Sequence, residues 1–298
     1  MKLVYLGTSA AVPTIERSLT CICLVRENEV LMFDAGEGAQ VAYLKASLPW
    51  NKKMKIFVTH LHGDHFLGIL GLLQTMPLQK RTESVEIYGP AGIEEFITAN
   101  IKVLNLVLPF PVFITIVNEG NVVIEKDYQV NCCDAQHGIP AFSYSFEENE
   151  RSGIFYPDKA KELGIPEGKL WQELQNGNSI NIDGKNIDSS QVTGEKRSGK
   201  KIGISGDTRP TEKLQEFFKN SDYLSFDCTF LDELKDRAIE TNHSTAKEAA
   251  ELAKNANVKN LILTHFSARY NDESVLLNEA KQIHESVIAA KDLLEIEI

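Results

Sequence analysis

Three histidines and one aspartate lie within six consecutive positions of this 298-residue chain. They are His60, His62, Asp64 and His65, in the run Thr-His-Leu-His-Gly-Asp-His-Phe. Neutral imidazole and carboxylate are the ligands that zinc and similar divalent cations prefer. Because a segment this short can aim its side chains at only one small volume, the run predicts a metal site suited to hydrolytic chemistry.

The segments that flank this run indicate how it is held. Residues 54–58 have the apolar character of a strand, and residues 66–76 have that of a helix. The run is therefore expected to form a loop at the carboxyl end of a strand, where α/β proteins tend to build sites. This context argues against the alternative that the histidines are solvated surface.

Other candidate ligands occupy the same kind of position. His137, Asp207 and His265 each follow a strand-like segment. Chance burial explains this recurrence poorly in a chain with only seven histidines. His284, by contrast, falls in a predicted helix over 274–291, on a face that we expect to be exposed, and we assign it no role.

Size and composition favour one large cytoplasmic domain with an insertion. Hydrophobic residues make up 43% of the chain, and no long linker or strict repeat divides it. No segment approaches the roughly 20 apolar residues of a membrane-spanning helix, and the first apolar run is too short for a signal peptide. Five cysteines, an odd count without Cys-x-x-Cys spacing, indicate reduced thiols.

The formal net charge of −11 has the wrong sign for a generic nucleic-acid binder. Part of that charge would surround the predicted metal site, where divalent cations offset it. Basic residues also gather locally, before the histidine run and again at residues 196–201. The net charge therefore disfavours a nucleic-acid substrate without excluding one.

Strand-like and helical patterns along the chain predict an α/β protein. The strand-like segments are too many for one open sheet with helical crossovers, so we expect two packed sheets with helices on their outer faces. Expected helices include 65–75 and 245–256, and His243 or Ser244 is placed to cap the second of these.

Residues 148–200 depart from this pattern. They are rich in Gly, Asn, Asp and Lys, with two short amphipathic pieces at 158–163 and 169–174. Little in this segment could join a common core, so we expect an inserted arm at 150–199 within a single domain of residues 1–298. From residue 150 to 200 the chain carries eight acidic and eight basic residues, which does not favour an electrostatic clamp in bulk.

In order, these residues resemble the signatures of the metallo-β-lactamase fold, an αββα sandwich of two packed sheets flanked by helices. Within that fold the match is closest to the tRNase Z family of endonucleases, which remove the 3′ trailer from precursor tRNA. The resemblance covers essentially the whole chain. The runs His-Ser-Thr at 243–245 and Thr-His-Phe-Ser-Ala-Arg-Tyr at 264–270, together with the arm, carry the closer match.

The resemblance implies two zinc ions, with manganese or iron as alternatives. The implied ligands are His60, His62 and His137 for one ion and Asp64, His65 and His265 for the other, with Asp207 bridging them. It further implies that Asp34 and Glu37 contact the ligand side chains on the side away from the metal ions and orient them. Glu37 could equally belong to a turn at the end of a strand. Two such cations assist in-line displacement at a phosphodiester.

Catalytic roles also follow from the resemblance. Asp64 would accept the proton of the attacking water. His243 would contact the phosphate or protonate the leaving 3′ oxygen, with Asp227 orienting it. The alternative for His243 is a helix cap without chemistry. Arg269 would pair with a phosphate of the substrate, and the arm would bind precursor tRNA, commonly across a homodimer.

The chain departs from the usual tRNase Z pattern at three places. The run Phe-Asp-Cys-Thr at 226–229 stands where the family often has His-Glu-Ala-Thr, and it keeps a carboxylate in Asp227. Of the loop Pro-x-Lys-x-Arg-Asn only Pro13 and Arg17 remain, and Gly168 precedes Lys169 where the arm usually has Gly-Pro. The cut position, including the treatment of a CCA end, stays open.

Two other functions remain as alternatives. A hydrolase of the same fold that acts on a small phosphodiester or ester would need the metal ligands but would be indifferent to deletion of the arm. A non-catalytic binding protein on this fold would commonly have lost ligands, whereas all seven ligand positions are intact here.

Overall fold

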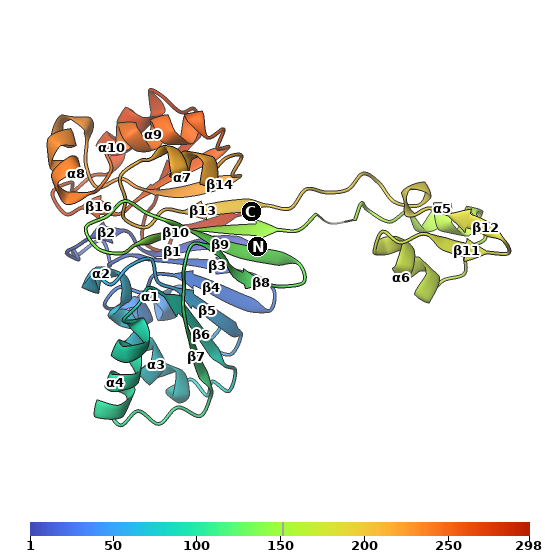
Figure 1. Ribbon diagram of the computed structural model, residues 1–298, viewed down its shortest axis with the longest axis horizontal. Coiled ribbons are helices and arrows are strands. Elements are labelled where there is room, and N and C mark those ends of the chain that lie inside the picture. The colour runs from blue at the N-terminus through green and yellow to red at the C-terminus, as the bar shows by residue number, and fades with distance from the viewer. Residues whose placement is uncertain (151) are drawn as a thin grey trace. The chain divides into compact units, whose positions relative to one another are not determined.

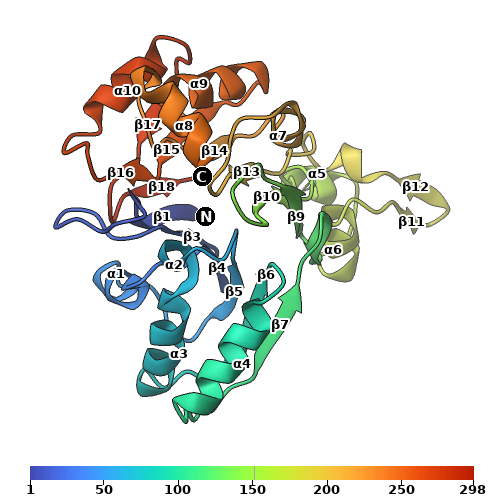
Figure 2. The same cartoon turned by 60° about the vertical axis from the view of Figure 1, so that its left-hand side comes forward.

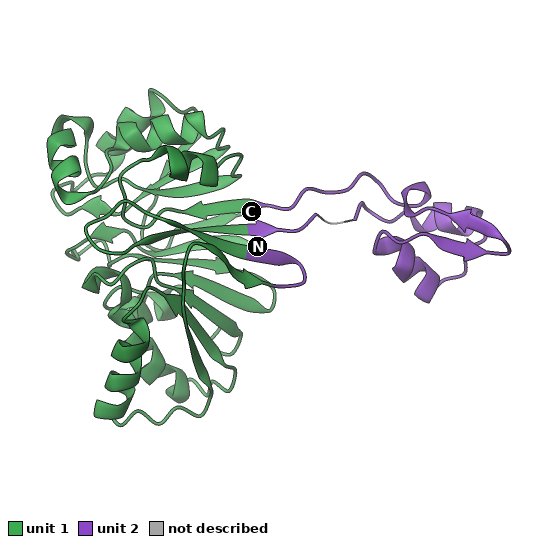
Figure 3. Cartoon of the chain, viewed as in Figure 1, with its two compact units in different colours: residues 1–124, 130–146, 201–298 green, residues 125–129, 147–200 purple. Residues whose placement is uncertain are grey.

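The computed structural model describes residues 1–150 and 152–298. These residues form two compact units, one of residues 1–124, 130–146 and 201–298 and the other of residues 125–129 and 147–200 (Figure 3). Arg151, one of the basic residues counted in the arm, lies outside the described residues. Among the described residues, no helix is long and apolar enough to cross a membrane.

The first sheet of the larger unit has seven strands in the order β18-β1-β3-β4-β5-β6-β7. Its strands β4 to β7 run parallel, so their carboxyl ends share one edge. The bounds are β1 (Lys2–Gly7), β3 (Cys21–Val25), β4 (Glu29–Phe33), β5 (Lys53–Phe57), β6 (Val85–Gly89), β7 (Val112–Ile116) and β18 (Glu295–Glu297).

The second sheet also has seven strands, in the order β17-β15-β14-β13-β10-β9-β8. Strands β13, β14, β15 and β17 are parallel to one another. The bounds are β8 (Gly120–Ile124), β9 (Tyr128–Asp134), β10 (Phe142–Glu148), β13 (Lys201–Ile204), β14 (Tyr223–Asp227), β15 (Asn260–Thr264) and β17 (Val287–Ala289). Two short parallel strands, β2 (Ser9–Ala10) and β16 (Phe266–Ser267), pair separately.

Helices cover the outer face of each sheet, as Figures 1 and 2 show. Over the first sheet lie α1 (Ala39–Lys45), α2 (Gly63–Phe66), α3 (Gly68–Leu78) and α4 (Ile93–Val103). Over the second lie α7 (Glu212–Phe217), α8 (Lys235–Thr241), α9 (Ala246–Asn255) and α10 (Ser274–Lys281), with the 3₁₀ turn η2 (Asp232–Leu234) before α8. The predicted arrangement of two packed sheets between helices is confirmed.

Alternation along the strands builds the cores on both faces of a sheet. In β4, Val30 and Met32 join the cluster that packs against α1, α3 and α4. The next residue, Phe33, points the other way and stacks on Phe57 of β5 with ring centroids 5.1 Å apart. Phe57 in turn lies 5.4 Å from the ring of Tyr144 of β10, in the opposite sheet. Aromatic contacts therefore join the two sheets behind their shared edge.

The predicted helix over 274–291 is wrong beyond its first half. Helix α10 ends at Lys281, and Val287–Ala289 form β17, which pairs in parallel with β15. His284 is therefore not on an exposed helix face: it is only 8% exposed, and its Nε2 donates to the carbonyl of Val258 at 2.9 Å. The β-branched Val287 and Ile288 favour the strand that local helical periodicity concealed.

Two further helix predictions need correction. The expected helix over 65–75 is split into α2 and α3, because the backbone N–H of Gly68 donates to the carbonyl of Ala35 at 2.9 Å and not to the preceding helical turn. Helix α9 is capped by Thr245, whose side chain forms a capping box with Glu248, and not by His243 or Ser244.

The smaller unit contains the two amphipathic pieces as helices α5 (Pro157–Glu162) and α6 (Lys169–Gln175). It also holds a hairpin of β11 (Ile180–Ile182) and β12 (Lys185–Ile187) and a 3₁₀ turn, η1 (Ser189–Gln191), which the sequence analysis did not predict. These elements enclose a small core of their own, made of Ala160, Ile165, Leu174, Ile180, Ile187 and Val192.

Candidate metal centre

The predicted ligands lie beyond the carboxyl ends of strands, Asp64 and His65 within the short helix α2 that follows β5. His60 follows β5, Asp207 follows β13 and His265 directly follows β15, while His137 lies three residues beyond β9. Since the strand ends of the two sheets meet at one edge, residues up to 205 positions apart converge, as the separation of His60 and His265 illustrates. The tertiary structure thus brings all seven predicted ligands together.

The first group of ligands comprises three imidazoles. His62 Nδ1 lies 3.0 Å from His60 Nε2 and 3.1 Å from His137 Nε2. His60 is fully buried, His137 is half-buried and His62 is exposed, so the group reaches from the interior to solvent. Three nitrogens that face one another at these distances suit a single small cation.

The second group combines two imidazoles and a carboxylate. The Nε2 atoms of His65 and His265 lie 3.3 Å apart. Asp64 Oδ2 lies 3.6 Å from His65 Nε2 and 3.7 Å from His265 Nε2, and it also accepts a hydrogen bond from the backbone N–H of Ala11 at 2.8 Å. This set is a second potential cation site.

Asp207 lies between the two groups. Its Oδ2 is 3.7 Å from His60 Nε2 in the first group and 3.3 Å from His65 Nε2 in the second. Its Oδ1 is buried and has no hydrogen-bond partner among the described residues, although His265 Nε2 is 3.3 Å away. An unsatisfied buried carboxylate oxygen is costly, and a cation at this place would satisfy it.

Hydrogen bonds on the far side of the imidazoles set their protonation. Thr59 Oγ1 donates to Asp34 at 2.8 Å, so at 3.0 Å it accepts from His60 Nδ1–H. His65 Nδ1–H donates to Asp34 at 2.7 Å, and His137 Nδ1–H donates to the carbonyl of Asn242 at 3.1 Å. Each bond places the proton on Nδ1 and leaves Nε2 as an acceptor that faces the cluster.

His265 is held in the same way by Thr229, which lies just beyond the end of β14. Thr229 Oγ1 donates to Asp227 Oδ1 at 2.7 Å and so accepts from His265 Nδ1–H at 3.0 Å. In their neutral forms, four histidines thus direct the lone pairs of their Nε2 atoms at a common volume. Lone pairs that face one another at close range repel, so the residues present fit bound divalent cations.

The pKa values of the ligands shift in different directions within the cluster. Burial, reinforced by the neighbouring His65, lowers the pKa of His60 to about 2. Burial also acts to lower the pKa of His265, but Asp207 and the nearby carboxylates of Asp227 and Asp64 raise it to about 10. The pKa of Asp207 is held well below its usual value because His265 and His65 outweigh its burial. The cluster therefore concentrates negative charge on Asp207.

Strained backbone accompanies the ligands. Asp34 and His265 are not glycine, yet they adopt left-handed conformations with φ of 58° and 61°. Gly206 also has a φ of 59°, and a Cβ there would lie 2.8 Å from the side chain of Thr59. This close approach lets the loop that carries Asp207 meet the loop that carries His60.

Of the remaining predicted site residues, His243, Asp227, Arg269 and Asp34 lie near the ligand cluster. His243 Nδ1 donates to Asp227 Oδ2 at 2.9 Å and lies 3.9 Å from Asp207 Oδ2, at the rim of the cluster. Arg269 is close by, because its guanidinium lies 4.9 Å from the centre of the Phe230 ring, and that ring is 6.3 Å from His243. Asp34 contacts His65 as expected.

Glu37, in contrast, is not brought to the cluster. It is exposed in the turn before α1, and within the described residues it has no hydrogen bond or ion pair to a ligand. Sequence analysis missed Thr59, Thr229 and Asn242. Thr59 directly precedes His60 at the start of the histidine run, whereas the carbonyl of Asn242 carries no signal in the sequence.

Comparisons with known proteins give a consistent picture. Residues 1–102, fewer than half of the chain, match a family model described as Anti-Pycsar protein Apyc1. A ribonuclease Z of Nitrosopumilus maritimus is 65% identical over 298 residues, which cover 100% of both chains. Human tRNase Z, short form, is 28% identical in its crystal structure, with a TM-score of 0.73 and coverage of 100% of this chain and 99% of that one.

The fold recurs beyond this level of identity. The metallo-β-lactamase fold protein YhfI of Bacillus subtilis is 17% identical, with a TM-score of 0.70 over 99% of this chain and 98% of that one. Its likeness shows the fold alone and confirms the predicted fold class. Because the 65% identical relative aligns along the entire chain, inserted segment included, this chain belongs to the ribonuclease Z family.

Proposed function

We propose that this protein is a metal-dependent endoribonuclease that removes the 3′ trailer from precursor tRNA. It cuts near the discriminator base and leaves a 3′-hydroxyl on the tRNA. The observation that carries the proposal is the convergence of five histidines and two aspartates at one sheet edge, in a chain that aligns with ribonuclease Z over its full length.

We also propose two zinc ions as the resident metals, with manganese or iron as alternatives. His60, His62 and His137 would hold one, Asp64, His65 and His265 the other, and Asp207 would serve both. When bound, two such cations activate water and stabilise the attacking and leaving oxygens of an in-line displacement. The support for this proposal is the facing Nε2 atoms and the unsatisfied Asp207 Oδ1.

His243 is proposed to give a proton to the leaving 3′ oxygen. Burial acts to lower the pKa of His243, but the charge and hydrogen bond of Asp227 raise it above its ordinary value. Because Nδ1–H is committed to Asp227, Nε2–H is the proton available to the substrate. Asp64 is proposed to receive the proton of the attacking water. The nearby imidazole of His265 and the charge of His65 outweigh burial and lower the pKa of Asp64, so it stays ionised.

Arg269 is proposed to contact a phosphate of the substrate. Its Nε donates to Ser267 Oγ at 3.0 Å, and its guanidinium lies over the Phe230 ring. The side chain is thus held in place near His243 while it remains exposed. A guanidinium so placed can bind a phosphate through two hydrogen bonds.

Residues 150–199 are proposed to bind the body of the tRNA. The smaller unit has its own core, so its removal need not disturb the catalytic unit. Lys159 lies over the ring of the partly exposed Tyr156 at 4.7 Å, and Lys161 lies 6.0 Å from that of Trp171. Basic and aromatic side chains together are a common means of binding RNA.

We further propose that the protein is a cytoplasmic homodimer. Large apolar side chains are exposed on α1, where Val41 is 50% and Leu44 is 47% accessible, and at the end of α4, where Val103 is 75% accessible. Val41 and Leu44 lie three positions apart on one helix, and exposed apolar side chains that gather on one face often mark an interface. Light scattering on purified protein tests the dimer, and substitution of Val103 by glutamate should weaken it.

The test of function is incubation of zinc-loaded protein with an end-labelled precursor tRNA, read on a sequencing gel. We expect one cut near the discriminator base. The matched variant replaces residues 150–199 by a short Gly-Ser link, which is feasible because the backbone N–H of Glu148 donates to the carbonyl of Lys200 at 2.9 Å.

This variant should lose tRNA cleavage and keep hydrolysis of a small chromogenic phosphodiester, because binding energy remote from the cut orients the scissile phosphate. Equal loss on both substrates would mean that the arm supports the fold. Hydrolysis of the small substrate by the intact protein without any cut in precursor tRNA would favour a small-phosphodiester hydrolase.

A further inference from the structure

The four residues 242–245, between α8 and α9, contact the site in two ways. The carbonyl of Asn242 accepts the Nδ1–H of His137, a candidate ligand, at 3.1 Å. The side chain of His243 donates to Asp227 at 2.9 Å. A shift of this one segment would therefore move both a metal-binding imidazole and the imidazole proposed to protonate the leaving group.

The segment is tied to the loop that carries Asp207. Ser244 Oγ donates to the carbonyl of Thr208 at 2.5 Å. Arg209, two residues after Asp207, donates from Nη1 to the carbonyl of His243. The backbone of the segment thus depends on groups from the strand end that places the carboxylate shared by both ligand groups.

Arg209 is itself fixed by a carboxylate on α9. Its Nη1 donates to Glu248 Oε2 at 2.8 Å, and its Nη2 donates to Oε1 of the same side chain. The side chains are only 11% and 7% exposed, so the pair is bidentate and largely shielded from solvent. Glu248 Oε2 also accepts the backbone N–H of Thr245 at 3.1 Å. The pair therefore grips the segment at two points.

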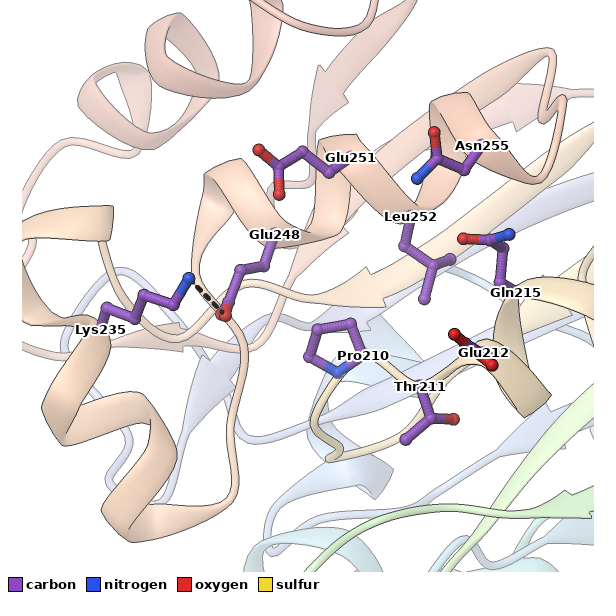
Figure 4. A pocket seen from close by; sticks show the side chains of 9 residues that line it. All are labelled: Pro210, Thr211, Glu212, Gln215, Lys235, Glu248, Glu251, Leu252 and Asn255. Carbon is purple, nitrogen blue, oxygen red and sulfur yellow. Dashed lines mark ion pairs between the residues drawn. The ribbon is translucent and has the colours of Figure 1, made fainter.

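Outside the pair lies a surface pocket between α7, α8 and α9. Figure 4 shows the ion pair of Lys235 and Glu248 at one end of it. In this pair Lys235 Nζ lies 3.5 Å from Glu248 Oε1. Lys235 is half exposed, so its charge offsets that of Glu248 from the solvent side. The guanidinium, which faces inward, is the component that reaches the His243 backbone.

We propose that Arg209 is a positioning residue of the active site, which holds residues 242–245 against the Asp207 loop. It keeps the Asn242 carbonyl on His137 and the His243 imidazole on Asp227. The role needs the planar fork of arginine, because one group must reach a carbonyl and both oxygens of a carboxylate at once. The inference rests on the proposed roles of His137 and His243 but not on tRNA as the substrate.

The test compares Arg209→Met and Arg209→Lys with the matched control Arg237→Met. Arg237 also pairs with a glutamate, Glu240, at 2.6 Å, but on the exposed surface of α8. For each protein, kcat and KM are measured on a small chromogenic phosphodiester. Zinc affinity is measured separately by competition with a chromophoric chelator, and circular dichroism confirms folding.

We expect Arg209→Met to lower kcat and the affinity for the zinc ion that His137 would help to hold, each by about 10–100-fold, the usual effect of removing a group that orients metal ligands. KM should stay within about twofold because no substrate contact is lost. Arg209→Lys keeps the charge without the fork and should fall in between, and the control should match the wild type.

Wild-type kcat and zinc affinity in a folded Arg209→Met protein would overturn the inference. So would a raised KM with unchanged kcat, which would indicate a substrate contact. Should Arg209→Met fail to fold, Arg209→Lys decides: wild-type behaviour overturns the inference and a lowered kcat with lowered zinc affinity supports it. Failure of the wild type to cut precursor tRNA would count against the proposed function only, since neither readout uses tRNA.

Discussion

Replacing Asp34 by asparagine is the sharpest test of how the metal centre is held. The carboxylate is 1% exposed and accepts three hydrogen bonds, from Thr59 N–H and Thr59 Oγ1–H at 2.8 Å each and from His65 Nδ1–H at 2.7 Å. Asparagine has the same shape but only one acceptor oxygen. In either orientation its NH₂ group therefore faces at least one of these donors.

The two orientations have different consequences. If NH₂ faces Thr59 N–H, a buried backbone donor is left unsatisfied. If NH₂ faces His65, the imidazole must accept at Nδ1, and its proton moves to Nε2, the atom that faces His265 and Asp207. A protonated Nε2 cannot bind a cation. The second outcome removes one ligand, and the first destabilises the fold around it.

The magnitude follows from these bonds. Loss of a charged hydrogen-bond partner in the interior costs about 1.5–3 kcal/mol of folding free energy. Changes to groups that orient a ligating histidine typically lower metal affinity by about 10–100-fold, which is about 1.4–2.8 kcal/mol. We expect the Asp34→Asn protein to remain folded and to bind one zinc ion nearly normally and the other weakly.

The assay is zinc competition with a chromophoric chelator, alongside urea unfolding of the metal-free protein. Asp188→Asn is the matched control, because Asp188 also accepts one backbone N–H and two hydroxyl hydrogens, from Ser190 and Ser179, but lies in the smaller unit. Its zinc binding should equal that of the wild type. Wild-type affinity for both ions in Asp34→Asn would refute the tautomer argument.

Three further substitutions test other parts of the structure. Asp207→Ala should abolish hydrolysis and weaken both zinc ions, since this carboxylate lies near both ligand groups; two ions in an active variant would contradict the assignment. Gly206→Ala should lower the free energy of unfolding in urea by roughly 2–5 kcal/mol, because of the left-handed φ of Gly206 and the clash of a Cβ with Thr59. The control Gly38→Ala, at a left-handed position in open space, should lower it by only about 1 kcal/mol. Equal losses in the two variants would rule out the clash. His284→Ala should lower the free energy of unfolding by about 1 kcal/mol with unchanged zinc affinity, and an unchanged urea midpoint would argue against its buried hydrogen bond.

Sequence alone was enough for the chemistry of the site. Imidazole and carboxylate have few uses at such close spacing, and apolar strands before His60, Asp207 and His265 place these residues at strand ends. Periodicity likewise predicts most strands, because alternation of buried and exposed side chains depends on neighbours in the chain. It fails at Val287–Ala289, where pairing with a distant strand overrides local helical character.

Only the tertiary structure decides how the ligands are held. The carbonyl of Asn242, the hydroxyl of Thr229 and the guanidinium of Arg209 contact the site through atoms that have no characteristic spacing in sequence. The sequence likewise does not predict that Glu37 is exposed or that His284 is buried. Residue type alone identifies which side chains can be ligands. Their orientation depends on the packing of loops from two sheets, which are far apart in the sequence, and no local pattern encodes that packing.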